Sequence, residues 1–258
     1  MRQAIRGLSP SMGFQDHFST KAAVYAQARP TYPPELFSYL AKLAPGRELA
    51  WDCGAGNGQA SLALAGHFSR VVATEPSQDQ LAQATVHPRV FYAQSSEIAP
   101  GLSDGSVDLV TAAQAAHWFD RGRFYPEVQR VLRPGGIVAL WTYALCRIDP
   151  AIDALVLRFY SDTVGPFWPP ERKHTENGYR DFEFPFEELA FPEFAMQHEW
   201  TLAQFTTYLR TWSSVTRYTK AKGIDPVGPF ETELAAVWGS APRQITWPLS
   251  GRLGRQSC

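Results

Sequence analysis

The chain has 258 residues, of which 45% are hydrophobic and 19% are charged, so it can bury a packed core and is not intrinsically disordered. Its 24 Lys and Arg balance 25 Asp and Glu to a net charge of −1, which argues against a general attraction to nucleic acid or to an anionic membrane. The apolar runs are far shorter than the roughly 18 residues of a spanning helix, and no signal peptide is evident. We expect a soluble, cytoplasmic protein.

Strand-like and helix-like segments alternate through the first half of the chain. Apolar spacing predicts a helix over 34–44, and a buried strand over 48–52 leads through a glycine-rich turn into a helix at 60–68. Further strands are expected at 71–74, 89–93, 107–111 and 137–141. A helix at 78–84 follows the first of these strands, and a helix that runs through Val128 to Leu132 precedes the last. This alternation is typical of a doubly wound α/β fold with a mostly parallel sheet and helices on both faces.

The pattern changes after Tyr143. Residues 165–191 contain prolines and aromatic side chains without a clear period, which favours a helical cap. The elements expected around that stretch are helices at 151–160, 203–212 and 229–238 and strands at 194–201 and 244–253. We predict a single domain, 1–258, whose parts are an N-terminal helical lid (1–44), a cofactor-binding core (45–145), a cap insertion (146–192) and a C-terminal part that completes the sheet (193–258).

The turn after the strand at 48–52 carries glycines at Gly54, Gly56 and Gly58, which let a ligand approach the backbone closely. A dinucleotide fingerprint would place its third glycine at position 59, which is Gln59, and such strands usually lack an acid at the position of Asp52. NAD is therefore disfavoured. S-adenosylmethionine fits better, because Asp52 can complement an ammonium group, directly or through water, and can also hold the loop.

Glu75 ends the next strand, 21 residues after Gly54, where its carboxylate can bind a ribose diol. With these residues the chain resembles class I S-adenosylmethionine-dependent methyltransferases. Further motifs of that resemblance lie at 75–77, 95–97, 107–110 and 130–136. The resemblance implies a seven-stranded Rossmann-like sheet, S-adenosylhomocysteine as product, and a cofactor contact at Pro76. Family members often bond the adenine amino group with an acid near Ser95, and this chain offers the Ser95 hydroxyl, groups at Ser96, or Glu97 instead. Glu97 can instead face solvent.

Three segments, 22–33, 114–120 and 211–214, are similar to a small-molecule branch that includes trans-aconitate methyltransferases. In that branch Tyr25 and Arg29 would lie over the methionine end of the cofactor, with Arg29 on its carboxylate, and Gln114 would contact the same moiety. The alternative for Arg29 is a surface arginine at a helix end.

His117 and Trp118 follow the strand at 107–111 and are expected at the mouth of the crevice that binds the cofactor. His117 is either a structural histidine or a catalytic one, and Trp118 either core or substrate-pocket wall. Scattered basic residues, either solvated or able to receive an anionic acceptor, are Arg158, Arg172, Lys173, Arg210 and Arg217. No spacing of Cys53, Cys146, Cys258 or the histidines suggests a metal or a disulfide framework.

The predicted function is methyl transfer from S-adenosylmethionine to a small-molecule acceptor, with O-methylation of a carboxylate favoured because a carboxylate is already ionised at neutral pH. On this hypothesis His117 positions the acceptor by a hydrogen bond. The alternatives are a catalytically silent S-adenosylmethionine-binding protein and a methyltransferase for hydroxyl groups or nucleic acid. No nucleic-acid or membrane partner is expected, and the oligomeric state is left open.

Overall fold

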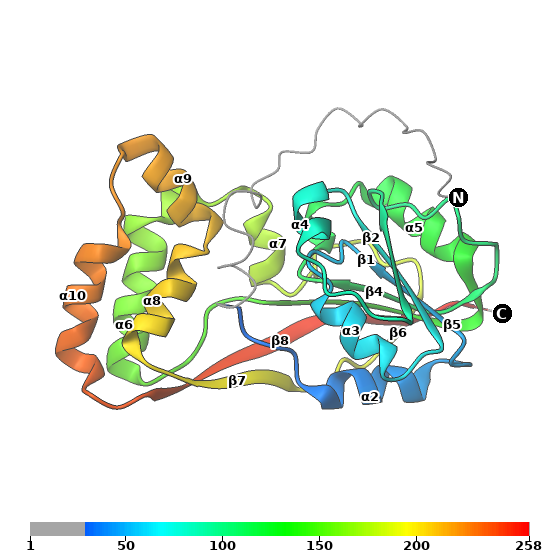
Figure 1. The fold of residues 1–258 in the computed structure, drawn as a ribbon, viewed down its shortest axis with the longest axis horizontal. Helices are drawn as coiled ribbons and strands as arrows, with labels where there is room; N and C mark the ends of the chain where they lie inside the picture. The colour runs from blue at the N-terminus through cyan, green and yellow to red at the C-terminus, as the bar shows by residue number, and fades with distance from the viewer. Residues whose placement is uncertain (1–28, 258) are drawn as a thin grey trace.

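The computed structural model describes residues 29–257, so the element labels begin at α2 (Figure 1). Its centre is a sheet in the order β3-β2-β1-β4-β5-β8-β6. The five parallel strands are β1 (Leu49–Cys53), β2 (Arg70–Glu75), β3 (Val90–Gln94), β4 (Val107–Ala113) and β5 (Leu132–Tyr143). The strand order changes direction between β1 and β4, and ligands of doubly wound sheets bind at the carboxyl ends beside such a switch point.

The last strands of the sheet run antiparallel along β8 (Arg243–Arg255). β6 (Glu187–Leu189) and β7 (Phe194–Trp200) pair with successive stretches of β8. Pro192 lies between them, and proline lacks the N–H that a continuous ladder requires. The predicted seven-stranded, mostly parallel sheet is confirmed. The position beside β8 is shared by two short strands, β6 and β7, so the structure describes eight strands.

Helices cover both faces of the sheet. α2 (Pro34–Leu43) and α3 (Gln59–Ala65) pack on one face, and α5 (Arg121–Val131) packs on the other. Side chains of β1 alternate between the two faces, with Ala50 in the first apolar cluster and Trp51 in the second. The short α4 (Gln78–Ala82) lies beside β2 and β3.

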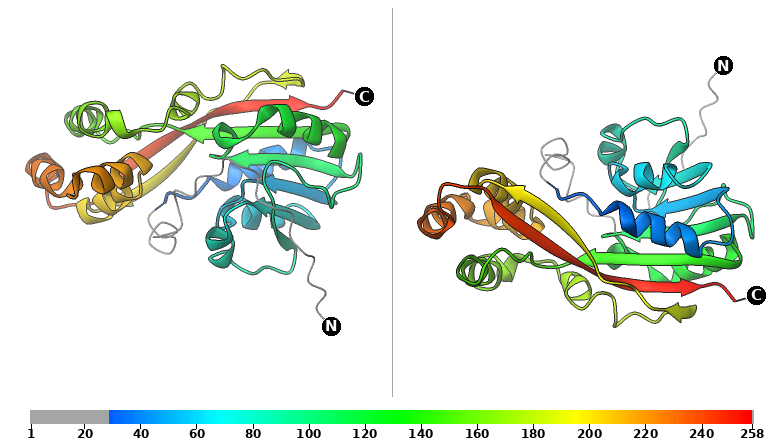
Figure 2. Two further views of the ribbon diagram at one scale, coloured as in Figure 1. Left: turned by 90° about the horizontal axis from the view of Figure 1, so that it is seen from above. Right: turned by 90° about the horizontal axis from the view of Figure 1, so that it is seen from below.

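A group of helices stands beyond the end of the sheet toward which β5 points (Figures 1 and 2). Its members are α6 (Pro150–Arg158), α8 (Leu202–Arg210), α9 (Ser213–Lys222) and α10 (Val227–Trp238). Stacked rings join them, with Phe159 and Phe230 4.3 Å apart and Phe205 and Trp238 5.3 Å apart between centroids. The short α7 (Arg172–Glu176) lies between this group and the sheet (Figure 1).

The structure differs from the expectation in three places. The helical group draws on the predicted C-terminal part as well as on the predicted cap, and α9 was not expected. A π-helical turn, η3 (Phe159–Thr163), and a 3₁₀ turn, η4 (Gly165–Phe167), follow α6 where a longer helix was predicted. α2, within the predicted lid, buries Leu36, Phe37 and Leu40 in the core.

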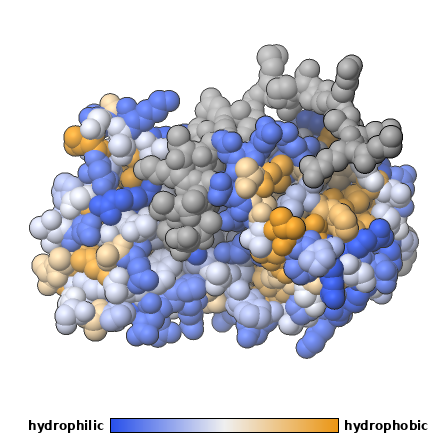
Figure 3. All heavy atoms as spheres, viewed as in Figure 1, coloured by the Kyte–Doolittle hydropathy of each residue, from blue (hydrophilic) through white to orange (hydrophobic). Residues whose placement is uncertain are grey.

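On the face shown in Figure 3, hydrophilic residues predominate, and apolar residues gather mainly in one area to the right of the centre. Among residues 29–257 there is no helix with the length and apolarity needed to cross a membrane.

Candidate active site

The loop after β1 turns sharply through left-handed backbone conformations. Gly54, Gly56 and Gly58 have φ values of +68°, +57° and +89°, which other residues adopt only at a cost. The backbone N–H groups of Gly54 and Ala55 donate to the carbonyl oxygen of Thr74 at 2.8 and 3.0 Å. The end of β2 therefore holds the loop at the switch point.

The three glycines of the loop differ in their surroundings. A Cβ at Gly54 would lie 2.6 Å from the Cβ of Ala115, and a Cβ at Gly58 would lie 2.1 Å from the Tyr92 hydroxyl. A Cβ at Gly56 would meet no atom of residues 29–257 within 4 Å. The backbone at Gly56 therefore borders open space, as a site for a closely approaching cofactor requires.

Asp52 is fully buried beneath the loop. Its carboxylate accepts hydrogen bonds from Ser61 on α3 at 2.6 Å and from Thr111 on β4 at 2.9 Å. In this position Asp52 links the end of β1, where the loop begins, to α3 and to β4. Because the carboxylate has no exposed surface, a direct contact with a cofactor ammonium does not fit this arrangement. Burial raises the pKa of Asp52 to about 6, against the effect of the two hydroxyl donors.

The raised pKa of Asp52 predicts a pH-dependent stability. The folded protein binds this proton more tightly than the unfolded chain, so the stabilisation is complete below about pH 4 and is lost as pH rises through about 6. Relative to Asp52→Asn, we expect the wild type to lose about 2 kcal/mol of unfolding free energy between pH 4.5 and 7.5. Urea unfolding of both proteins at the two pH values measures this loss. An equal change of the unfolding free energy in the wild type and in Asp52→Asn would contradict the prediction.

Glu75 lies at the end of β2, 7% exposed, with its carboxylate turned toward the glycine loop. One oxygen accepts the backbone N–H of Gly56 at 2.9 Å and the other accepts that of Ser77 at 3.0 Å. A carboxylate at this position is the group that commonly binds the hydroxyls of an adenosine ribose. The residues present therefore fit an adenosine cofactor, with Glu75 at the end of β2 and open space at Gly56.

The loop after β3 was expected to help bind the cofactor through Ser96 and Glu97. The Cys53 thiol lies 3.9 Å from the Ser96 carbonyl oxygen, so this loop does reach the end of β1. Glu97 is 8% exposed and pairs with Arg123 of α5 at 3.0 Å, which excludes the solvent-facing alternative. Pro76 directly follows β2 at the same edge. Cofactor contacts of Pro76, Ser96 and Glu97 stay predictions.

Gln114 follows β4 and has a φ of +55°, a strained value for a residue with a side chain. Its backbone N–H donates to the Trp141 carbonyl oxygen at 2.8 Å, and its Nε2 donates to the Tyr143 carbonyl oxygen at 3.1 Å. The Oε1 atom accepts the Thr142 hydroxyl. β5 thus holds this residue at the switch point, where the sequence placed it.

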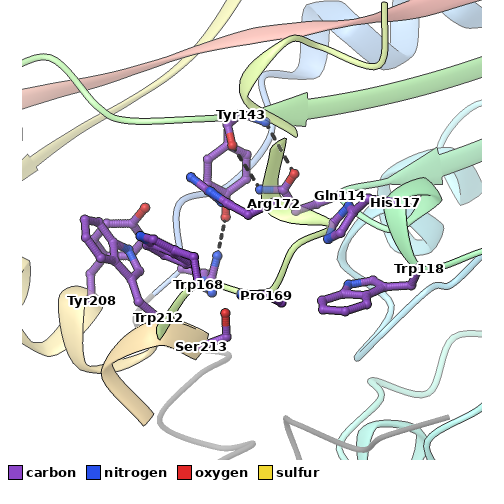
Figure 4. A pocket seen from close by; sticks show the side chains of 11 residues that line it. Gln114, His117, Trp118, Tyr143, Trp168, Pro169, Arg172, Tyr208, Trp212 and Ser213 are labelled. Carbon is purple, nitrogen blue, oxygen red and sulfur yellow. Dashed lines mark hydrogen bonds between the residues drawn. The ribbon is translucent and has the colours of Figure 1, made fainter. Parts of the chain in front are cut away.

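A pocket lies between these strand ends and the helical segments (Figure 4). Its lining residues are Arg29, Gln114, His117, Trp118, Tyr143, Trp168, Pro169, Arg172, Tyr208, Trp212 and Ser213. Gln114, His117 and Trp118 face Trp168, Tyr208 and Trp212 across it. The pocket therefore brings together Arg29, Gln114, His117 and Trp118, four residues that the sequence singled out.

Arg29 connects the start of the described chain to this pocket. It donates to the Tyr143 hydroxyl at 2.7 Å and to the Thr211 carbonyl oxygen at 3.4 Å, and its guanidinium lies 5.7 Å from the centre of the Tyr208 ring. These contacts favour a functional position over a surface arginine, while the pairing with a methionine carboxylate stays a prediction. Tyr25 lies outside the described residues.

His117 belongs to a 3₁₀ turn, η2 (Ala116–Trp118), and is half-buried. Its Nδ1 lies 3.1 Å from the hydroxyl of Tyr179, a fully buried residue of the cap segment. Burial lowers the pKa of His117 to about 3, and the charges of Arg172 and His174 lower it further. The ring is therefore neutral at physiological pH. Trp118 is 37% exposed at the rim of the pocket, as expected for a wall residue.

The basic residues named from the sequence have different environments. Arg158 pairs with Glu233, and Arg210 pairs with Asp225 and Glu231, all within the helical group. Arg172 differs, because it lines the pocket and forms no ion pair with a carboxylate among residues 29–257.

The Arg172 guanidinium is held by aromatic side chains. It lies 4.6 Å from the centre of the Trp168 ring and 5.4 Å from that of Tyr160. Its Nε donates to the Tyr160 hydroxyl at 2.8 Å, and that hydroxyl also contacts Glu176. The two terminal nitrogens form no hydrogen bond within the described chain, so a preorganised cation borders the pocket.

Sequence reasoning missed much of the far wall of the pocket, including Tyr143, Tyr208 and Ser213. Trp168 and Arg172 had been noted only within larger aromatic and basic sets. No local pattern separates a pocket-facing aromatic from a core one. The available signal is the segment 211–214, which is similar to the small-molecule branch and contains Trp212 and Ser213.

Comparisons with known proteins agree with this geometry. A family model described as a methyltransferase domain matches residues 51–140. A putative methyltransferase of Dictyostelium discoideum is 37% identical over 216 residues, which are 82% of this chain and 82% of that protein. A probable S-adenosylmethionine-dependent methyltransferase of Saccharomyces cerevisiae is 31% identical over 132 residues, which are 48% of this chain and 45% of that protein.

Solved structures extend the likeness to the helical segments. A putative type II methyltransferase from Anaeromyxobacter dehalogenans has a TM-score of 0.84 and 47% identity, covering 89% of this chain and 98% of that one. A putative methyltransferase from an antibiotic biosynthesis pathway of Anabaena variabilis shares the fold at 18% identity, with a TM-score of 0.53 over 87% of this chain and 99% of that one. The chain therefore belongs to the class I S-adenosylmethionine-dependent methyltransferases.

Proposed function

We propose that this methyltransferase methylates a carboxylate oxygen of a small anionic molecule that binds in the pocket between Gln114 and Arg172. The observation that carries the proposal is the Arg172 guanidinium, which borders the same pocket as the carboxyl end of β4. A cation held in this way attracts an anion and orients it by charge-assisted hydrogen bonds. The similarity of 22–33 and 114–120 to trans-aconitate methyltransferases supports the same class of acceptor.

The chain contributes to the reaction mainly by placing and desolvating the acceptor. S-adenosylmethionine, when bound, supplies an electrophilic methyl group. Trp118, Trp168 and Trp212 line the pocket, and aromatic walls of this kind leave a bound carboxylate nucleophile less solvated than it is in water. Arg172 restricts its orientation, and such positioning can supply much of the acceleration of a transfer between two bound molecules. No protein group has to remove a proton.

We further propose a division of these tasks along the single domain. The core, 45–145, binds the cofactor through the glycine loop and Glu75. The cap segment, 146–192, contributes Trp168 and Arg172 to the acceptor wall, and 193–258 contributes Tyr208 and Trp212 as well as completing the sheet. The lid role predicted for 1–44 concerns residues mostly outside the described range.

The experiment that tests this function incubates the protein with methyl-labelled S-adenosylmethionine and either a small-molecule extract or total RNA and DNA. We expect label in the small-molecule fraction alone. Label in nucleic acid, or cofactor binding without any transfer, would contradict the proposal and support one of the alternatives named above.

Replacing Arg172 with glutamine is expected to raise the KM for a confirmed anionic acceptor about tenfold to a hundredfold, because charge-assisted hydrogen bonds are lost. The affinity for S-adenosylmethionine should not change. Arg158→Gln is the matched control, since Arg158 lies on the helical group and pairs with Glu233. Steady-state kinetics of both variants measure the effect, and an unchanged KM in Arg172→Gln would overturn the assigned role.

His117→Ala is expected to lower the rate about tenfold, since one positioning hydrogen bond is lost. Because the pKa of His117 is about 3, the wild-type rate should stay nearly flat between about pH 6.5 and 9. General-base catalysis would instead cost about a hundredfold or more in the variant. The pH profiles of both proteins decide between these roles, and an acid limb near neutrality that disappears in His117→Ala would contradict ours.

A further inference from the structure

Tyr160 contacts three residues of the acceptor pocket without lining the pocket itself. Its hydroxyl accepts from Nε of Arg172 at 2.8 Å, and its backbone carbonyl oxygen accepts from the indole N–H of Trp168 at 3.3 Å. Its ring centre lies 4.9 Å from that of Trp168, and it meets the Trp212 ring edge-on at 5.7 Å. Tyr160 is buried behind these residues and is not part of the pocket lining. One buried side chain thus connects the cation of the pocket with two of its aromatic walls.

The direction of each hydrogen bond at the Tyr160 hydroxyl follows from its partner. The Nε–H of an arginine can only donate, so the Tyr160 oxygen accepts from Arg172. The hydroxyl has a single proton and gives it to a carboxylate oxygen of Glu176, which can only accept. Burial raises the pKa of Tyr160 to about 12, so the hydroxyl keeps this proton at physiological pH. Both bonds are therefore satisfied in one arrangement.

The backbone around Tyr160 departs from a regular α-helix. Tyr160 belongs to η3, a π-helical turn in which the Val164 N–H donates to the Phe159 carbonyl oxygen at 3.0 Å. A turn of this kind inserts one extra residue and is frequent at functional sites. The next carbonyl oxygen along the turn is that of Tyr160, and it binds the indole of Trp168. The turn therefore also fixes the ring over which the Arg172 guanidinium lies.

The bond at Nε determines which edge of the Arg172 guanidinium a ligand can use. An arginine binds a carboxylate through two parallel N–H bonds, either from Nε and one terminal nitrogen or from the two terminal nitrogens. Nε of Arg172 is occupied by Tyr160. Its Nη1 and Nη2 form no hydrogen bond within residues 29–257 and are not buried, and the side chain lines the pocket (Figure 4). The edge formed by the two terminal nitrogens is therefore the one left for an acceptor.

We infer that Tyr160 is a positioning residue of the acceptor site, which holds Nε of Arg172 so that Nη1 and Nη2 together bind the acceptor carboxylate end-on. Each carboxylate oxygen then keeps a further lone pair that can attack the methyl group. In this respect the inference rests on the proposed function. The orientation of the Arg172 side chain does not depend on it.

NMR of the full chain with ¹⁵N-labelled arginine tests the bond at Nε directly. The Nε–H signal of Arg172 is assigned by its loss in Arg172→Gln. We expect this proton to exchange with water at least about tenfold more slowly than that of Arg47. The Arg47 guanidinium also lies over a ring, 5.9 Å from the centre of Phe68, but it forms no hydrogen bond within residues 29–257. Equally fast exchange at the two arginines would overturn the inference and would leave methyl transfer untouched.

Tyr160→Phe removes the hydroxyl and keeps the ring, so the Nε–H of Arg172 should lose its slow exchange in this variant. Tyr218→Phe is the matched control. The Tyr218 ring packs on Phe167 in the same helical group, and its hydroxyl has no hydrogen-bond partner within the described chain. Slow exchange that persists in folded Tyr160→Phe would contradict the assigned bond.

A double-mutant cycle tests whether Tyr160 acts through Arg172. With a confirmed anionic acceptor, Tyr160→Phe should raise KM about threefold to tenfold, while the affinity for S-adenosylmethionine stays unchanged. In Arg172→Gln the same substitution should add nothing, because the bond that it removes is already absent. An equal increase in both backgrounds would show that Tyr160 acts independently of Arg172 and would overturn its positioning role. An unchanged KM in Arg172→Gln alone would instead refute the proposed function, while the exchange result at Nε would stand.

Discussion

Gly56→Ala should weaken cofactor binding severely while leaving the fold intact. The added methyl group would meet no atom of residues 29–257 within 4 Å and would instead project into open space. We expect the dissociation constants of S-adenosylmethionine and S-adenosylhomocysteine to rise at least about a hundredfold, because the ligand would have to leave its contact with the loop backbone. Titration calorimetry measures this, and thermal or urea unfolding reports the cost to the fold.

Gly105→Ala is a matched control for the strain in Gly56→Ala. Gly105 has a φ of +58°, against +57° at Gly56, and its Cβ would also meet nothing within 4 Å among the described residues. Both variants should therefore lose a similar stability, about 1–2 kcal/mol for a left-handed residue with a side chain. Gly105 lies in the turn before β4, far from the carboxyl ends of the strands. Equal cofactor affinity in the two variants would contradict the placement of the cofactor at Gly56.

Glu75→Ala should weaken cofactor binding about tenfold to a hundredfold, since two hydrogen bonds to ribose correspond to roughly 1.5–3 kcal/mol. The same substitution also leaves the N–H groups of Gly56 and Ser77 without their carboxylate, so part of the loss comes from a looser loop. Glu75→Gln should behave similarly, because its amide nitrogen would face one of those N–H donors.

Asp108→Ala controls for the loss of a buried carboxylate in Glu75→Ala. Asp108 is fully buried and accepts from the backbone N–H groups of Glu48 and Leu49 at 2.9 and 3.0 Å, a pattern like that of Glu75. It lies at the start of β4, the opposite end of the strand from Gln114. We expect lower stability but unchanged cofactor affinity. Calorimetry showing a comparable loss of affinity in Asp108→Ala would remove the specific role of Glu75.

The core of the fold was predictable because its signals are local. Each strand between positions 48 and 143 is an apolar run bounded by Gly, Pro or Asp, and the glycine loop occurs where three backbone positions require positive φ. The same locality placed Glu75 and Gln114 at strand ends, since those positions follow from the strand boundaries alone.

The helical group was less predictable because its elements depend on contacts between distant segments. α9 contains Thr216, Thr219 and several basic residues and lacks a clear apolar stripe, so only packing against its neighbours stabilises it as a helix. Similarly, nothing near Arg172 indicates that Trp168 and Tyr160 hold it at the pocket. The link from Tyr179 to His117 joins positions 62 residues apart in sequence and could be found only in three dimensions.

The bond formed in the product tests the proposed carboxylate acceptor most directly. The labelled small-molecule product is isolated after turnover and treated with mild alkali. A methyl ester is cleaved by this treatment, so we expect the label to be released as volatile methanol. Label retained in the non-volatile product would show an ether, amine or carbon-bound methyl group and would contradict methylation of a carboxylate.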